Sequence, residues 1–246
     1  MGLWQGLVEL ARGLREVVYP GVCGLCDRPG PTDPLIPFLC PVCKELLSHD
    51  PALACPRCAS MVGPFTHLED GCPNCRTERF AFDAASCFGR YQDRLRELVL
   101  RMKHHSAEGL AEMAGTLWAS LRGPELAKLD IEIVVPVPLH WWRRLTRGYN
   151  QSEALARSLA EGLNLPCQPG LLRRIRHTPH QSHLPATQRR INVAGAFRAS
   201  ADVRGLSFLL VDDVMTTGAT SDEAARALKA SGASRVVAAA LARATG

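Results

Sequence analysis

The hydrophobic pattern beyond about residue 80 predicts strands that alternate with helices. Residues 131–137 (IEIVVPV) and 208–211 (FLLV) are short, nearly continuous apolar runs, which are typical of strands buried on both faces of a parallel sheet. Residues 80–91 are also typical of strand-forming sequence. Apolar residues recur at helical spacing in three further segments, 95–102, 151–162 and 221–230. This order of elements predicts an α/β domain with an open, mainly parallel sheet flanked by helices.

The first 20 residues have a different pattern. Leu3, Leu7, Leu10, Leu14 and Val17 fall on one face of a helix. We expect this amphipathic helix to pack on the protein itself, and a helix lying on a membrane surface is the alternative. Charged residues interrupt the segment, so it does not have the apolar core of a signal peptide. The chain also has no apolar run of about 18 residues, so we expect no membrane span and a cytoplasmic location.

Residues 21–78 are organised around cysteine pairs. Eight of the ten cysteines form four C-x-x-C pairs, and the unit C-x2-C-x13-C-x2-C occurs twice. Each pair presents two thiolates to one ion, and two pairs complete a tetrahedral site, so the pattern predicts two structural zinc ions in two ribbons. The predicted ligands are Cys23, Cys26, Cys40 and Cys43 in the first unit, and Cys55, Cys58, Cys72 and Cys75 in the second.

Other interpretations of the cysteines stay open at this stage. The pairs could be redox motifs, iron–sulfur ligands or sites that no longer bind metal, and the first pair could combine with the third instead of the second. Equal spacing within each unit favours sequential pairing. Four thiolate ligands leave no open coordination position, so we expect no catalytic role for the ions.

The most specific motif is LLVDDVMTTGAT at residues 209–220. Two adjacent acids, Asp212 and Asp213, end an apolar strand, and a turn of small hydroxyl residues then leads into a helix. Backbone N–H groups and the helix dipole converge at such a turn, which suits a phosphate. The carboxylates beside it can accept hydrogen bonds from the two hydroxyls of a ribose. The motif therefore predicts a pocket for a ribose 5-phosphate.

Positive charge gathers in the region that precedes this motif. The net charge of the 246-residue chain is only +5, but residues 140–190 contain nine arginines and two acids. Arg143, Arg144 and Arg147 follow the strand at 131–137, where an open α/β sheet places its ligands. Arginine binds polyphosphates through paired N–H donors. The region therefore predicts an anionic partner: a polyphosphate, a nucleic acid, or both.

These motifs resemble two known families. LLVDDVMTTGAT is similar to the phosphoribosyl pyrophosphate (PRPP) motif of type I phosphoribosyltransferases. Together with VVPVPLHWWRRLTRGYNQSEALA and TPHQSHLPATQRRINVAGAF, it resembles the ComF family, in which a zinc ribbon module precedes a phosphoribosyltransferase domain. The apolar and cysteine patterns, together with the resemblance, predict an amphipathic helix at 1–20, a double zinc ribbon at 21–78 and a phosphoribosyltransferase-like domain of the type I fold at 79–246.

The resemblance and the residue chemistry together nominate the site. Asp212 and Asp213 are the predicted catalytic residues, which hold the ribose diol. The 5-phosphate loop consists of Val214, Met215, Thr216, Thr217, Gly218, Ala219 and Thr220. Residues predicted to reach the pyrophosphate or to form the mobile hood are Lys103, Arg143, Arg144, Arg147, Gln151, Gln181 and Arg189. Mg²⁺ would accompany PRPP, because hard oxygen ligands suit it.

Three functions are compatible with these features. The first is a PRPP-dependent phosphoribosyltransferase. The second is a non-catalytic module that binds single-stranded DNA or a helicase partner during DNA uptake, the setting that the ComF resemblance implies. The third is a zinc-stabilised scaffold with a relict pocket.

Overall fold

The chain forms two compact units, Met1–His49 and Asp50–Gly246. We describe them from a computed structural model, which covers residues 21–48, 53–105, 107–139, 146, 148–176, 178 and 186–244. The first unit holds helix α2 (Pro41–Ser48) and one cysteine repeat. The second unit holds the other repeat together with the α/β domain. The boundaries that the sequence suggests after residues 20 and 78 stay predictions about domain organisation.

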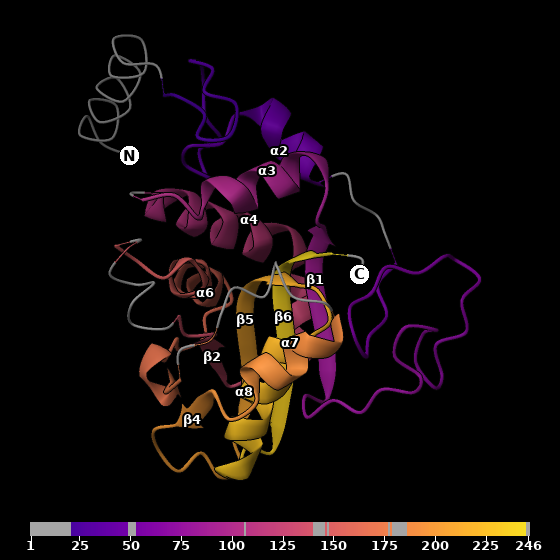
Figure 1. The fold of residues 1–246 in the computed structure, drawn as a ribbon. Coiled ribbons are helices and arrows are strands. Elements are labelled where there is room, and N and C mark those ends of the chain that lie inside the picture. Colours follow the sequence, from indigo (N-terminus) through magenta and orange to yellow (C-terminus); the bar gives the residue numbers. More distant parts are fainter. Residues whose placement is uncertain are drawn as a thin grey trace, which may run out of the picture. The chain divides into compact units, whose positions relative to one another are not determined.

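A four-stranded parallel sheet forms the centre of the described part of the second unit (Figure 1). Its order is β1 (Ala84–Arg90), β6 (Arg235–Arg243), β5 (Ser207–Met215) and β2 (Ile133–Pro136). The two central strands, β5 and β6, are buried almost throughout. Continuous apolar sequence is therefore stable there, because helices cover both faces of the sheet.

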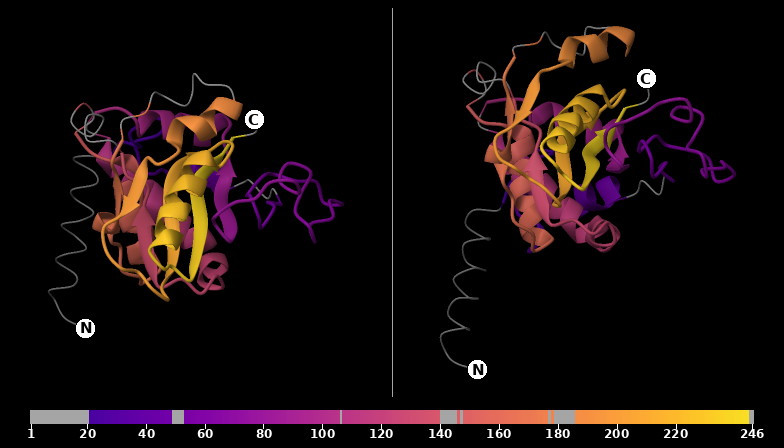
Figure 2. Two further views of the ribbon diagram at one scale, coloured as in Figure 1. Left: turned by 60° about the horizontal axis from the view of Figure 1, so that its bottom comes forward. Right: turned by 90° about the horizontal axis from the view of Figure 1, so that it is seen from below.

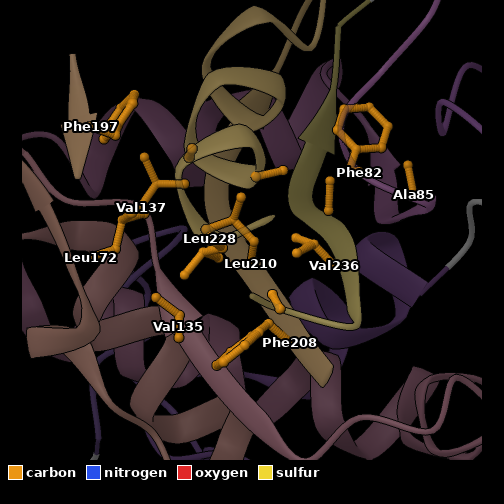
Figure 3. Packing of buried hydrophobic residues seen from close by; sticks show 14 of the residues in the cluster. Phe82, Ala85, Val135, Val137, Leu172, Phe197, Phe208, Leu210, Leu228 and Val236 are labelled. Carbon is orange, nitrogen blue, oxygen red and sulfur yellow. The ribbon is translucent and has the colours of Figure 1, made fainter. Parts of the chain in front are cut away.

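Helix α8 (Ala219–Ala230) covers one face of this sheet (Figures 1 and 2). Phe208 and Leu210 of β5 and Val236 of β6 point into the same apolar cluster as Leu228 of α8 (Figure 3). The cluster extends to a small antiparallel ribbon of β3 (Leu172–Arg174) and β4 (Phe197–Ala199). A short helix, α7 (Ala186–Val193), precedes β4 and contacts α8.

Helices α4 (Glu108–Ala127) and α6 (Gln151–Gly162) pack against each other, and α6 contacts β2 and β5. Their crossing is close: a Cβ at Gly115 would lie 2.4 Å from the carbonyl oxygen of Leu155. Helix α3 (Asp93–Arg101) connects the edge strand β1 to this layer. A one-turn 3₁₀ helix, η1 (Pro169–Leu171), leads into β3.

Most predicted elements agree with the structure in type and differ in their ends. Helix α6 spans the predicted residues 151–162, and Asn150 caps it by accepting a hydrogen bond from the Ser152 N–H at 3.2 Å. Helix α8 begins two residues earlier than predicted, because Gly218 adopts a left-handed conformation with φ 80° and starts the helix at Ala219. Residues 80–83 precede β1 and are not part of that strand.

The sequence pattern did not predict helix α4. Most of its middle turns are buried, including Met113, Leu117 and Trp118, and only a narrow stripe that contains Glu112 and Ser120 is exposed. A helix with so narrow a polar face shows only a weak helical period in its sequence.

No described helix combines the length and apolar character needed to cross a bilayer. The amphipathic segment 1–20 lies outside the described residues.

Candidate functional site

Asp212 and Asp213 lie near the carboxyl end of β5, where the sheet meets the loop before α8. Asp213 is buried and Asp212 is partly buried. Strand β5 continues past both acids to Met215, which is in register with Arg243 of β6. The acids are therefore held by a central strand with a neighbour on each side, and this fixes their backbone positions.

Side chains from the turn after α3 and from the start of α6 contact this pair of acids. The Lys103 ammonium group lies 3.3 Å from Asp213 Oδ2, and the Gln151 amide donates to the same oxygen at 3.2 Å. The Ser152 hydroxyl donates to Asp212 Oδ1 at 2.9 Å. The site therefore brings two acids, one cation and two neutral donors together at one end of the sheet.

Two hydrogen bonds explain how these distant segments meet. The Asn150 amide donates to the carbonyl oxygen of Val137, directly after β2, which places the start of α6 beside the end of β5. The Tyr149 hydroxyl donates to the carbonyl oxygen of Met102, which places Lys103 next to the same helix start.

The surroundings of Asp212 change its pKa. Burial, followed by the neighbouring Asp213 charge, raises the pKa of Asp212 to about 8, and the Ser152 hydroxyl offsets only part of that rise. These surroundings favour the protonated form of Asp212 in the free protein. Hydroxyl donors or a cation at the site would favour its ionised form.

This raised pKa predicts a pH-dependent stability. An unfolded aspartate has a pKa of about 3.9. Between pH 4 and 8 the folded state keeps a proton that the unfolded state has lost, so the free energy of unfolding falls as pH rises through this window. We expect the Asp212→Asn variant to lose this dependence and to melt at a higher temperature than the wild type at pH 8, with little difference at pH 4. Thermal unfolding across this range, with exposed Asp202→Asn as control, measures the effect; parallel pH profiles for all three proteins would contradict it.

The loop after β5 is the segment for which the sequence predicts a phosphate site. Gly218 ends it in the left-handed region, and the Ala219 N–H lies 3.4 Å from the Thr217 hydroxyl oxygen. The first N–H groups of a helix lack partners within the helix, so the start of α8 directs donors and the positive end of its dipole toward the loop. The predicted loop residues Val214, Met215, Thr216, Thr217, Gly218, Ala219 and Thr220 therefore run from the end of β5 into the first turn of α8.

The other predicted site residues divide into two groups. The structure places Lys103 and Gln151 directly on Asp213. Arg189 lies in α7, which contacts α8. Arg143, Arg144, Arg147 and Gln181 lie outside the described residues. Sequence reasoning missed Ser152, although its place two residues after the helix cap Asn150 was a usable signal.

Eight cysteines form two separate clusters, one in each compact unit. Cys23, Cys26, Cys40 and Cys43 form the first cluster, and Cys55, Cys58, Cys72 and Cys75 form the second; within each, the sulfur atoms lie within 4.8 Å of one another. Sequential pairing is therefore confirmed. One sulfur–sulfur distance in the first cluster and three in the second lie between 3.6 and 3.9 Å, and a tetrahedral zinc ion with Zn–S bonds of about 2.3 Å requires about 3.8 Å. Both clusters fit structural zinc.

The two repeats begin with the same local structure. In the first, the Cys23 N–H donates to the carbonyl oxygen of Arg28; in the second, the Cys55 N–H donates to that of Ser60. The residue after each second cysteine, Asp27 or Ala59, has a positive φ of 57° or 56°. The sequence repeat is therefore also a repeat of the knuckle structure that presents the thiols.

The thiols at the start of each knuckle are disposed to ionise. Burial raises the pKa of Cys55, but backbone N–H donors from Arg57, Cys72 and Cys58 outweigh it and bring the value down to about 7. Backbone donors act in the same way on Cys23, whose pKa is also about 7. Thiolates are the form that binds zinc, so each site contains a ligand ready at neutral pH.

Comparison with known proteins agrees with this geometry. Residues 146–245 match the family model of the phosphoribosyl transferase domain, a span that contains α6, the acids, the loop and α8. The chain is 30% identical to competence protein F of Haemophilus influenzae over 213 residues, which are 84% of this chain and 90% of that protein. The chain belongs to the ComF family.

Two further relatives are similar to this chain. DNA utilization protein YhgH of Salmonella typhimurium is 31% identical over 89% of this chain and 96% of its own length. Competence protein ComFC of Bacillus subtilis is 35% identical over 39% of this chain and 38% of its own length. The predicted combination of cysteine modules with a phosphoribosyltransferase domain is thus confirmed.

Proposed function

We propose that this ComF protein binds PRPP together with Mg²⁺ and acts as a phosphoribosyltransferase in the cytoplasm, in the uptake or use of DNA. One observation carries the proposal: two adjacent acids near the carboxyl end of β5 are followed, two residues later, by a loop that Gly218 turns into the start of α8. Donors for a phosphate and acceptors for a diol then follow each other closely along the chain, as binding of a ribose 5-phosphate would require. The names of the relatives support the setting in DNA uptake.

Each group of residues would have a separate role in binding and catalysis. N–H groups and hydroxyls of Thr216 to Thr220 hold the 5-phosphate, and Asp212 and Asp213 accept hydrogen bonds from the ribose hydroxyls. Mg²⁺ would supply positive charge to the pyrophosphate and ribose oxygens when bound. As the bond from ribose C1 to the pyrophosphate oxygen breaks, the electron pair leaves with pyrophosphate, and the acceptor forms the new bond at C1. Lys103 lies close enough to the acids to offset negative charge there. Catalysis would rest on positioning and electrostatics.

Calorimetric titration with PRPP tests this function. We expect binding that requires millimolar Mg²⁺ and that ribose 5-phosphate competes away, since both ligands share the 5-phosphate and the diol. An unchanged heat signal on adding millimolar PRPP and Mg²⁺ to the zinc-loaded protein would refute the proposal.

A second candidate function, binding of single-stranded DNA, is favoured by the β3–β4 ribbon. Arg173 and Arg198 are both exposed and lie directly opposite each other in the ribbon. Like charges opposite each other destabilise an antiparallel pair, and a phosphate backbone between them would remove that cost. A helicase partner in DNA uptake fits the same basic face.

The salt dependence of DNA binding tests this second function. For single strands the slope of log affinity against log salt is about −0.7 per neutralised phosphate. We therefore expect the Arg173→Gln/Arg198→Gln variant to have a slope smaller by about 1.4 than the wild type. Arg204→Gln is a control, because exposed Arg204 pairs with Asp202. Equal slopes for the double variant and the wild type would exclude the ribbon as the contact.

A further inference from the structure

Arg243 connects the second cysteine cluster to the phosphate loop. This last residue of β6 is buried, and its guanidinium donates to the carbonyl oxygen of Met215 at 3.0 Å and to the Ser60 hydroxyl at 2.9 Å. Met215 is the last residue of β5 and the second residue of the predicted 5-phosphate loop. Ser60 belongs to the knuckle of the second cluster, since its carbonyl oxygen accepts from the Cys55 N–H at 2.9 Å. The buried guanidinium of Arg243 therefore contacts both the knuckle, at Ser60, and the N-terminal end of the loop, at Met215.

The second end of the loop contacts the segment that leaves the same cluster. Phe80 packs against the four cysteines and stacks on Phe82, with ring centroids 4.5 Å apart. A Cβ at Gly218 would lie 3.6 Å from Phe80 and 3.7 Å from Phe82, so the two rings form the wall behind the turn. The Ala81 N–H donates to Asp222 Oδ1, in the first turn of α8, at 2.5 Å.

The predicted hood is attached to the same segment. Arg190 of α7 forms an ion pair with Glu78 and lies over the Phe80 ring, 6.0 Å from its centroid. The knuckle itself is also continuous with the domain: the Ala85 N–H at the start of β1 donates to the carbonyl oxygen of Pro56 at 2.8 Å, and Ala59 is part of the main apolar core.

We propose that the second cysteine cluster is a brace for the phosphate loop, and that Arg243 is the positioning residue through which the knuckle at Ser60 holds the loop in its phosphate-binding shape. The ligand part of this inference rests on the proposed function. Zinc at Cys55, Cys58, Cys72 and Cys75 would keep the knuckle closed, so that Ser60 and Phe80 stay in place against both ends of the loop. The resulting role for this cluster is control of phosphate affinity, in addition to stabilising its own segment.

Replacing Arg243 tests the brace without altering a zinc ligand. We expect Arg243→Met to retain two zinc ions per chain. It should bind PRPP with Mg²⁺ about tenfold more weakly, because hydrogen bonds from a charged group contribute binding energy of that order. It should also speed amide hydrogen exchange in residues 213–221. Arg243→Lys keeps the charge but offers one nitrogen in place of the two guanidinium nitrogens that reach Met215 and Ser60, so it should recover only part of the affinity. The matched control is Arg90→Met, since Arg90 is exposed and in register with Arg243 on the neighbouring strand.

A second variant covers the case in which Arg243→Met does not fold. Ser60→Ala removes only the acceptor on the knuckle, and it should also speed exchange in the loop at full zinc content. Unchanged PRPP affinity and unchanged loop exchange in the folded variants would overturn the brace. If the wild type itself fails to bind PRPP, the proposed function falls, and loop exchange in Arg243→Met and Ser60→Ala still decides whether the cluster braces the loop.

Discussion

The double variant Asp212→Asn/Asp213→Asn is expected to bind PRPP with Mg²⁺ at least a hundredfold more weakly than the wild type. Hydrogen bonds to a charged group contribute roughly 1.5–3 kcal/mol each, so losing a carboxylate partner for both ribose hydroxyls corresponds to about 10²–10⁴ in affinity. Asparagine has nearly the same shape as aspartate, so Ser152 and Gln151 keep acceptors at these positions. Calorimetric titration at fixed Mg²⁺ concentration measures the change.

The control for this prediction is Asp202→Asn, because Asp202 is an exposed aspartate whose described partner is Arg204. It makes the same chemical change away from β5 and should bind PRPP as the wild type does. If the double variant matched this control in affinity, the acids would not contact the sugar, and the assignment of the diol site would be wrong.

Loss of the second metal site is expected to have the largest effect on stability. The wild type should contain two zinc ions per chain, and Cys58→Ser/Cys72→Ser should contain one. Structural zinc contributes apparent binding free energies of about 10–16 kcal/mol in small zinc-binding peptides. We expect the double variant to lose the knuckle structure and to lower the melting temperature of the α/β domain, because Ala59 belongs to that domain's core.

Elemental analysis and calorimetric melting measure these two effects. Cys26→Ser/Cys40→Ser is the matched variant in the first cluster. It should also lose one zinc ion, but Met1–His49 is a separate compact unit, so the transition of the second unit should stay unchanged. Iron in place of zinc, or a wild type with fewer than one ion per chain, would contradict the zinc assignment.

The parts of the site that are local in the chain could be predicted from the sequence. The acids and the loop follow one another within a dozen residues, so strand, turn glycine and helix start can all be recognised together. The cysteine knuckles are local in the same way: backbone bonds such as Ala59 N–H to the Cys55 carbonyl close within four residues. Only the pairing of the knuckles remained open, because spacing does not determine which distant pairs meet.

The contacts between the start of α6 and the acids of β5 could not be predicted from local sequence patterns. Ser152 reaches Asp212 across 60 residues of sequence, and Gln151 reaches Asp213 across 62. Such contacts depend on the crossover from β2 to α6 and on its anchoring by Asn150. The apolar character of α4 hid that helix, although α4 is the layer on which α6 rests.

The sequence by itself determined the chemistry that this protein carries: four thiols for each of two metal sites, and two acids beside a turn suited to phosphate. Those properties depend on residue type and short-range backbone geometry, which neighbouring residues control. Only the tertiary structure decided that the second cluster lies against the phosphate loop, because the sheet register brings Arg243 beside Met215 and the packing of the core places Ser60 within reach of its guanidinium. A contact of that kind joins residues that are far apart in the chain, and a one-dimensional pattern contains no signal for it.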